Sequence, residues 1–186
     1  MKGKGSTHSM RIRNYRQGDV ELLEYIQQLA AQADGTRAID RHEFEAWLLE
    51  PELEARFNVF VVTDDDETNE WGQGGTLEGM EGEVIGYTIL QLRQDEHVYH
   101  FLCEGAVHPQ HRRRGAGSAL LICAINRARL MAAGFDLRME SKHRSIYFEA
   151  LLPIHDLAAA NLAARCEMEP AEEQAAPGMK LYRRAL

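Results

Sequence analysis

The stretch AVHPQHRRRGAGSALL, residues 106–121, says more about the fold than any other part of the chain. An apolar run over 98–107 predicts a strand that ends before Pro109, and the arginines and glycines after it lead into an amphipathic helix. The first backbone N–H groups of a helix have no acceptor within the helix and lie at the positive end of its dipole. Gly115 and Gly117 lack Cβ atoms and let an oxyanion approach this backbone, while the arginines add positive charge. The stretch therefore predicts a phosphate-binding helix entrance.

Two other phosphate-binding loops have spacings that this stretch does not match. A P-loop requires Gly-Lys followed by Ser or Thr, and the chain lacks that triplet. A dinucleotide fingerprint requires a third glycine, whereas Gly117 is followed by Ser118, Ala119 and Leu120. A triple arginine before a helix can also be a solvated surface turn, but its setting between a strand and a helix favours the anion site.

The composition indicates one globular domain of ordinary size. The chain has 186 residues, of which 45% are hydrophobic and 27% charged, and this is enough to bury a core. Its 29 acidic residues exceed its 21 basic ones, and the formal net charge of -8 argues against nucleic acid and anionic membranes as partners. No apolar run reads as a bilayer span of ~20 residues or as a signal peptide, so a cytoplasmic location is expected.

Neither the cysteines nor the histidines have the spacing of a metal site. Cys103, Cys123 and Cys166 lie far apart, which predicts free thiols in a reducing compartment rather than disulfides. The histidines show no paired zinc spacing, and the acidic run that begins at Asp64 lacks the glycine and glutamate positions of an EF-hand loop. No metal is therefore expected.

Residues 10–186 are expected to form a single domain. Residues 1–9 are polar and read as a disordered leader or a tag remnant. Residues 64–82 combine acidic residues with glycines, which predicts a mobile insertion between two strands.

Periodicity and turn residues predict the order of the helices and strands. One helix is capped by Asp19 and closed by Gly35, with an apolar face formed by Leu22, Leu23, Ile26, Leu29 and Ala30. A second is capped by Asp40, with Glu43 at capping-box spacing, and later helices span 115–133 and 157–166. Strands are predicted over 11–15, 57–62, 84–92, 98–107, 135–140 and 179–184, and 145–154 is predicted to be irregular. The strand over 135–140 directly follows a helix, so it should pair in parallel with 98–107.

The spacing of Arg112, Gly115 and Gly117 resembles the Gln/Arg-x-x-Gly-x-Gly/Ala signature of the GNAT superfamily of acyl-CoA-dependent N-acyltransferases. The order of the predicted elements also resembles the GNAT fold over roughly residues 10–186. This resemblance implies an α/β (α+β) fold with a central mixed, largely antiparallel sheet. It further implies about six to seven strands, about four flanking helices, and a splayed pair in which strand 98–107 diverges from its neighbour.

The resemblance also implies a reaction and its residues. An acetyl group would pass from acetyl-CoA, as cosubstrate, to a primary amine of a small molecule or peptide by direct attack. The residues implied to hold coenzyme A are Ala106, Val107, Arg112, Arg113, Arg114, Gly115, Ala116, Gly117 and Ser118. Glu104, at the end of the strand, is the candidate catalytic base, the alternative being an ordinary exposed glutamate. Cys103 has no adjacent base and is expected to be a core thiol rather than a nucleophile.

The chain departs from the family pattern in its last helix. Where the family has Asn and a proton-donating Tyr, this chain has Asp156 and Ala163. Another donor could take the place of the tyrosine, with Tyr147, His143 and Ser145 as candidates, or water could protonate the leaving thiolate. The alternative is a catalytically degenerate module that binds acyl-CoA without turnover.

The stretch from Glu104 to Gly115 resembles one half of the tandem-domain acetyltransferases typified by mycothiol synthase. Those proteins contain two GNAT repeats, and this chain contains one. A second copy could replace the other half, so a homodimer is expected.

Overall fold

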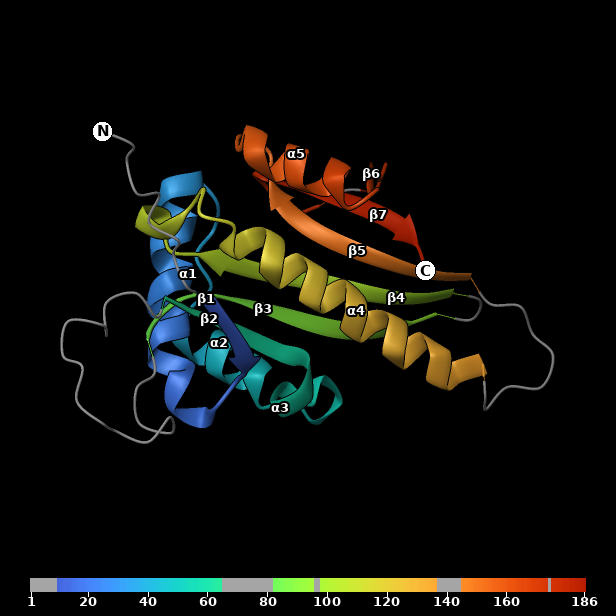
Figure 1. Cartoon of the computed structure of the whole chain (residues 1–186), viewed down its shortest axis with the longest axis horizontal. Helices are drawn as coiled ribbons and strands as arrows, with labels where there is room; N and C mark the ends of the chain where they lie inside the picture. Colours follow the sequence, from blue (N-terminus) through green and yellow to red (C-terminus); the bar gives the residue numbers. More distant parts are fainter. Residues whose placement is uncertain (1–9, 65–81, 96–97, 137–144, 174) are drawn as a thin grey trace, which may run out of the picture.

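The computed structural model describes residues 10–64, 82–95, 98–136, 145–173 and 175–186. Within these residues the strands form a single seven-stranded sheet in the order β1-β2-β3-β4-β5-β7-β6 (Figure 1). Neighbouring strands pair antiparallel except β4 and β5, which are parallel. The strands are β1 Met10–Asn14, β2 Val59–Asp64, β3 Glu83–Gln94, β4 Val98–Val107, β5 Ser145–Pro153, β6 Glu169–Pro170 and β7 Met179–Ala185. This is the mixed, largely antiparallel sheet that the family resemblance implied.

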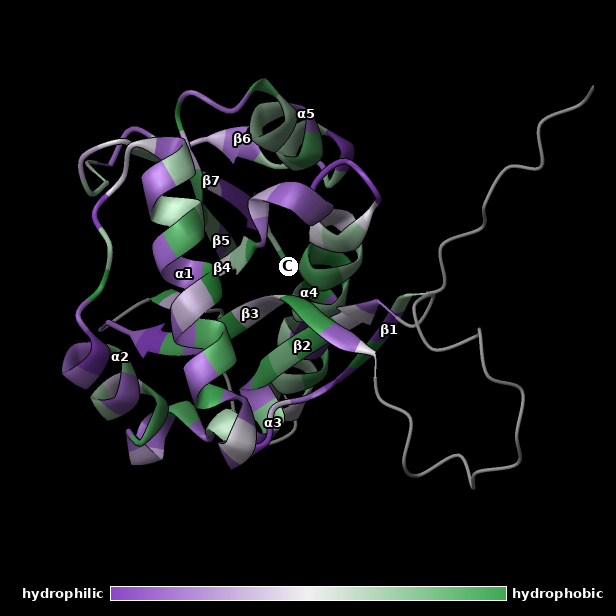
Figure 2. Ribbon diagram, turned by 90° about the vertical axis from the view of Figure 1, so that its left-hand side faces the viewer, coloured by the Kyte–Doolittle hydropathy of each residue, from purple (hydrophilic) through white to green (hydrophobic). Residues whose placement is uncertain are grey.

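Helices cover both faces of the sheet. Figure 2 shows α1 and α2 on one side of the sheet and α4 on the other. On the side of α4, buried residues of α5 join the same core cluster. The helices are α1 Val20–Asp34, α2 Arg41–Leu48, α3 Ala55–Asn58, α4 Ala116–Asp136 and α5 Leu157–Arg165, with 3-10 turns at Gln17–Asp19, Pro51–Leu53 and Pro109–His111.

The ends of the first two helices follow from local chemistry. Gly35 adopts a left-handed conformation with φ 65° and closes α1, as its lack of a Cβ permits. Asp40 caps α2, its carboxylate accepting the backbone N–H of His42 at 2.9 Å. The sequence predicted that Asp19 caps α1, and this is wrong: Asp19 precedes α1, but its side chain makes no capping hydrogen bond. Its carboxylate instead accepts two hydrogen bonds from Arg13, each of 2.7 Å.

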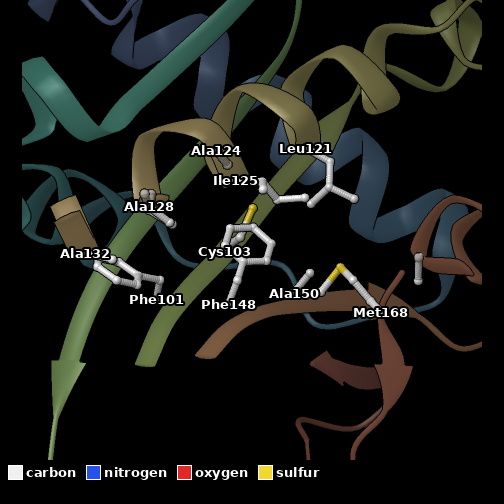
Figure 3. Packing of buried hydrophobic residues seen from close by; sticks show 12 residues of the cluster. Phe101, Cys103, Leu121, Ala124, Ile125, Ala128, Ala132, Phe148, Ala150 and Met168 are labelled. Carbon is white, nitrogen blue, oxygen red and sulfur yellow. The ribbon is translucent and has the colours of Figure 1, made fainter. Parts of the chain in front are cut away.

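The core on the α4 side joins β4, β5 and the two later helices. Figure 3 shows Phe101 and Cys103 from β4 beside Phe148 and Ala150 from β5, beneath α4. The residues of α4 that pack on them follow one another at the spacing of a single helix face; they are Leu121, Ala124, Ile125, Ala128 and Ala132. A separate cluster joins α1 and α2 to β2 and β3 on the opposite face.

The predicted strand over 135–140 is wrong at its start and lies outside the described residues over 137–140. Phe135 and Asp136 are helical, because α4 continues past Gly134. The Phe135 ring stacks on Tyr99, with centroids 4.6 Å apart, and lies 6.1 Å from Phe101. These contacts with β4 outweigh the tendency of glycine to end a helix. The parallel partner of β4 is β5, the segment that the sequence had left irregular.

Three smaller boundaries also differ from the sequence prediction. Phe57 is helical in α3, so β2 begins at Val59. Asp64 is a buried residue of β2 rather than part of an insertion, and Glu83 already belongs to β3. Residues 1–9 and 65–81, which include the leader and most of the expected insertion, lie outside the described residues.

Helix α4 contains an apolar stretch that the sequence analysis did not count as long enough to span a bilayer. Its residues Ala116–Phe135 are long and apolar enough to cross a membrane by length and composition alone. In the structure the helix lies along the sheet, with one side in the core and with Ile122 and Leu130 exposed on the other. Core helices of soluble proteins meet the same criterion.

Candidate active site

The site begins where β4 and β5 separate. Their parallel pairing runs from Val98 opposite Ser145 to Cys103 opposite Ala150 and stops there. Strand β4 nevertheless continues to Val107 and β5 to Pro153. The arrowheads of the two strands diverge in Figure 1. The end of β4 therefore has an edge that β5 leaves unpaired.

The residues that present backbone groups to this edge can be identified from the hydrogen bonds. The N–H of His108 donates to the carbonyl of Ile85 at 2.8 Å, so it points toward β3. Backbone polar groups alternate in direction along a strand whose register with β3 is unbroken, so those of Gly105 and Val107 point into the gap. The Val107 carbonyl already accepts the Nε of Arg112 at 3.1 Å. The sequence had named Ala106 and Val107 for this edge and had missed Gly105.

Gly105 is a glycine because β3 lies so close. A Cβ there would stand 2.3 Å from the carbonyl oxygen of Tyr87 and 2.9 Å from the Cα of Thr88. No other residue fits at this position without moving the strand.

The helix entrance has the form that the sequence predicted. Gly115 has φ +98°, which favours glycine, and its carbonyl accepts the N–H of Ala119 at 3.0 Å. The N–H groups of Ala116, Gly117 and Ser118 therefore come before the hydrogen-bond ladder of α4. A Cβ on Gly117 would meet side chains at 3.7 and 3.9 Å, which are ordinary contacts. The packing of the protein does not require this glycine, and its missing side chain leaves room for a ligand.

Each of the three arginines is paired with an aspartate. Arg112 donates to both carboxylate oxygens of Asp34, at 2.6 and 2.9 Å, and so ties the loop to the end of α1. Arg113, which has a left-handed φ of 67°, donates to Asp156 at 2.9 Å. Arg114 lies 3.6 Å from Asp64. Because these pairs neutralise much of the arginine charge, the backbone N–H groups of the helix entrance are the main anion-binding feature.

A cavity of about 670 Å³ joins the helix entrance to the strand gap. Its walls come from α1, α2, β3, the ends of β4 and β5, the start of α4, and α5. Its residues include Gln27, Trp47, Tyr87, Glu104, Val107, Gly117, Leu152 and Asn161. This volume is typical of small-molecule and cofactor sites. A second hollow of about 770 Å³ lies at the β6–β7 edge among residues such as Glu169 and Arg183, and it shares no residue with this cavity. The first cavity therefore contains both the helix entrance and the unpaired edge of β4.

Glu104 lies just past the last β4–β5 pair and lines the cavity. Burial raises the pKa of its carboxyl above the ordinary value, and the charge of Arg93 only partly opposes this. Tyr87 lines the same cavity, and burial followed by the Glu104 charge raises the pKa of its phenol. The cavity therefore contains a carboxylate with an increased affinity for protons and a phenol that stays protonated.

Cys103 is a core thiol, as the sequence predicted. Its side chain is 5% exposed, and burial raises the pKa of the thiol to about 12. Its Sγ lies 3.1 Å from the Oγ1 of Thr88 and packs under α4 (Figure 3). Because the nucleophilic form is the thiolate, this cysteine is unsuited to attack. All three cysteines are free.

The last helix gives no tyrosine to the cavity. Asp156 caps α5 by accepting the N–H of Ala158 at 2.9 Å. Ala163 is fully buried in the core, and among the described residues of α5 the cavity is lined by Ala158, Ala159, Asn161, Leu162 and Arg165 instead.

The suggested replacements for the tyrosine do not lie there either. Ser145 and Tyr147 stand at the start of β5, whereas the cavity is lined by the opposite end of that strand. His143 lies outside the described residues. Among the described residues, the tyrosine that lines the cavity is Tyr87, which the sequence reading had missed.

Comparisons with known proteins agree with this geometry. The model of the acetyltransferase (GNAT) family matches residues 33–148. A mycothiol acetyltransferase from Saccharopolyspora erythraea is 41% identical over 49 residues, which are 26% of this chain and 16% of that protein. The chain thus spans only a small part of that relative.

Two solved structures show the same fold. A GCN5-related N-acetyltransferase from Sphaerobacter thermophilus superposes with a TM-score of 0.63 at 15% identity, covering 87% of this chain and 44% of that chain. The protein yncA from Salmonella typhimurium, solved with acetyl-CoA, superposes with a TM-score of 0.59 at 19% identity, covering 95% of this chain and 92% of that chain. Since the family model matches more than half of its residues, the chain belongs to the acetyltransferase (GNAT) family.

Proposed function

We propose that this chain is an acyl-CoA-dependent N-acetyltransferase that moves an acetyl group from acetyl-CoA to a primary amine of a small molecule or peptide. The observation that carries the proposal is that the helix entrance and the unpaired edge of β4 line one cavity. The first fits a pyrophosphate, and the second fits an extended arm with amide groups.

The residues that would hold coenzyme A follow from this arrangement. The N–H groups of Ala116, Gly117 and Ser118 would bind its pyrophosphate, and Arg113, exposed and paired with Asp156, lies in the same loop. The backbone of Gly105 and Val107 would pair with the pantetheine arm. Arg112 would not contact the cosubstrate itself. Its hydrogen bonds to Asp34 and to the Val107 carbonyl would hold the loop before α4 in place. When bound, acetyl-CoA supplies the thioester carbonyl that the amine attacks.

Two residues of this chain would handle the protons. The Glu104 carboxylate, whose pKa burial raises, would accept a proton from the amine, directly or through water. The Tyr87 phenol stays protonated and lines the same cavity, which makes it a candidate to donate a proton to the leaving thiolate. Neither role needs a covalent intermediate on the enzyme, in agreement with the protonated state of Cys103.

The test is acetyl transfer from acetyl-CoA to a panel of polyamines, aminoglycosides, amino acids and peptide N-termini. Release of coenzyme A that requires an amine would support the proposal, and no transfer to any of them would contradict it. Tight acetyl-CoA binding without transfer would instead favour a binding module, an alternative that the buried alanine at Ala163 keeps open. The expected homodimer and cytoplasmic location stay predictions.

A further inference from the structure

One buried polar atom on the wall of the cavity has no partner. Gln27 is 8% exposed, lines the cavity, and its Oε1 has no hydrogen-bond partner among the described residues. Most buried polar side-chain atoms in folded proteins are hydrogen-bonded, because leaving an acceptor unpaired costs about 1–3 kcal/mol. An unpaired acceptor on a cavity wall indicates a donor that arrives with a ligand.

Gln27 lies on α1 at the boundary between the residues that pack in the core and those that line the cavity. Leu23, one turn before Gln27, and Ile26, the residue directly before it, pack with β2 and β3 in the core. Gln27, Ala30, Ala31 and Asp34 then line the cavity with polar or small side chains at helical spacing. Gln27 is a polar residue on the apolar face of α1, and the sequence analysis did not identify it as a site residue.

Glu104 lies on the same face of the sheet as α1. It stands opposite Ile89 in the β3–β4 register, and Ile89 packs in one core cluster with Leu23 and Ile26. Gln27 and Glu104 therefore present two oxygen acceptors to one cavity. Ile39 and Trp47 line this cavity from the segment between α1 and α2 and from α2, and they give it an apolar and aromatic wall.

We propose that Gln27 positions the acceptor substrate, its Oε1 accepting an N–H of a primary amine that is carried on an apolar or aromatic body. The inference rests on the proposed function and names the substrate class. A primary amine has N–H groups to donate and keeps a lone pair for attack, whereas a carboxylate or phosphate has none to give Gln27. Glu104, on the same face of the sheet as α1, favours a cation over an anion at this end of the cavity.

The probe is phenethylamine, compared with its N,N,N-trimethylammonium derivative, which has the same body and positive charge but no N–H group. Binding is measured by calorimetry on the protein saturated with coenzyme A, which carries no acetyl group and cannot react. We expect wild type to bind the primary amine roughly tenfold more tightly, the value of one good hydrogen bond. Gln27→Met, which keeps the length of the side chain without an acceptor, should bind both compounds equally.

Gln28→Met is the matched control, because Gln28 is the next residue of α1 and its exposed side chain bonds to Glu24. It should keep the wild-type preference. Gln27→Met should melt no lower than wild type without ligand, since it removes an unpaired acceptor. A Gln27→Met variant that keeps the preference for the primary amine would overturn the proposal, as would a wild type that binds neither compound.

The experiments distinguish failure of this inference from failure of the proposed function. Acetyl transfer that does not depend on Gln27 would remove the inference and leave the function intact. Amine binding that depends on Gln27, without any transfer from acetyl-CoA, would do the opposite.

Discussion

At the scale of single residues, Glu104 is the carboxylate best placed for the chemistry. It lines the cavity just beyond the last paired residues of β4 and β5. Glu104→Gln keeps the shape of the side chain and removes the base. We expect the rate of acetyl transfer to fall about a hundredfold or more, with unchanged acetyl-CoA affinity. A fall of less than about threefold in single-turnover measurements would remove Glu104 from this role.

The raised pKa of Glu104 also predicts how stability depends on pH. Because the folded state holds the proton more tightly than the unfolded state, this residue contributes stability below the ordinary carboxyl pKa. That contribution is lost as the pH rises through the raised pKa. Glu104→Gln does not lose it, so its melting temperature relative to wild type should rise as the pH increases above the ordinary carboxyl pKa of about 4. A difference that stays constant as the pH increases would contradict the raised pKa.

At the scale of elements, the start of α4 should decide the binding of coenzyme A. Gly117→Glu places a long, negatively charged side chain where the pyrophosphate is expected. We expect calorimetry to detect no binding of coenzyme A to this variant. Gly134→Glu is the control, because it lies near the other end of the same helix with nothing within 4 Å of a new Cβ. Equal affinity in both variants would place the phosphate site elsewhere.

The close approach of β3 and β4 should make Gly105 irreplaceable for stability. The Cβ of Gly105→Ala would stand 2.3 Å from the Tyr87 carbonyl, so the strands must separate. We expect a loss of roughly 1–3 kcal/mol in urea unfolding, as for other overpacked sites. Gly18→Ala has open space around its Cβ and should change little. Equal effects of the two substitutions would show that β3 and β4 are not so close.

At the scale of the whole molecule, the cavity joins elements from both halves of the chain, so a ligand there should stabilise the fold as a unit. Coenzyme A at a hundredfold excess over its Kd should add about 2.7 kcal/mol to the free energy of unfolding. A thermal melt with and without the ligand measures this. No shift at millimolar coenzyme A would contradict binding at this site.

The fold was predictable from the sequence wherever local signals decide it. The helix entrance depends on glycines and arginines that are neighbours in the chain, so their spacing was enough to identify it. Strand β5 was missed because its apolar residues do not alternate and Glu149 interrupts them. That carboxylate is buried only because Arg183 and His100 bond to it from neighbouring strands, at 2.7 and 3.0 Å.

The candidate site was predictable in part for the same reason. Glu104 and the loop glycines come from the motif itself. Gln27 and Tyr87 reach the cavity through packing between α1 and β3, which no short sequence pattern records. The aspartate partners of the three arginines also come from distant segments. The sequence therefore showed positive charge at the loop but not its neutralisation.

The unpaired end of β4 has a consequence for how the protein behaves on its own. An open strand edge is a template on which a strand from another molecule can add, and this is a known route to aggregation. Here the edge lies inside a cavity, where a long flat strand has poor access but a narrow cosubstrate fits. The shape of the cavity would therefore admit the cosubstrate to this edge and keep strands of other molecules away from it.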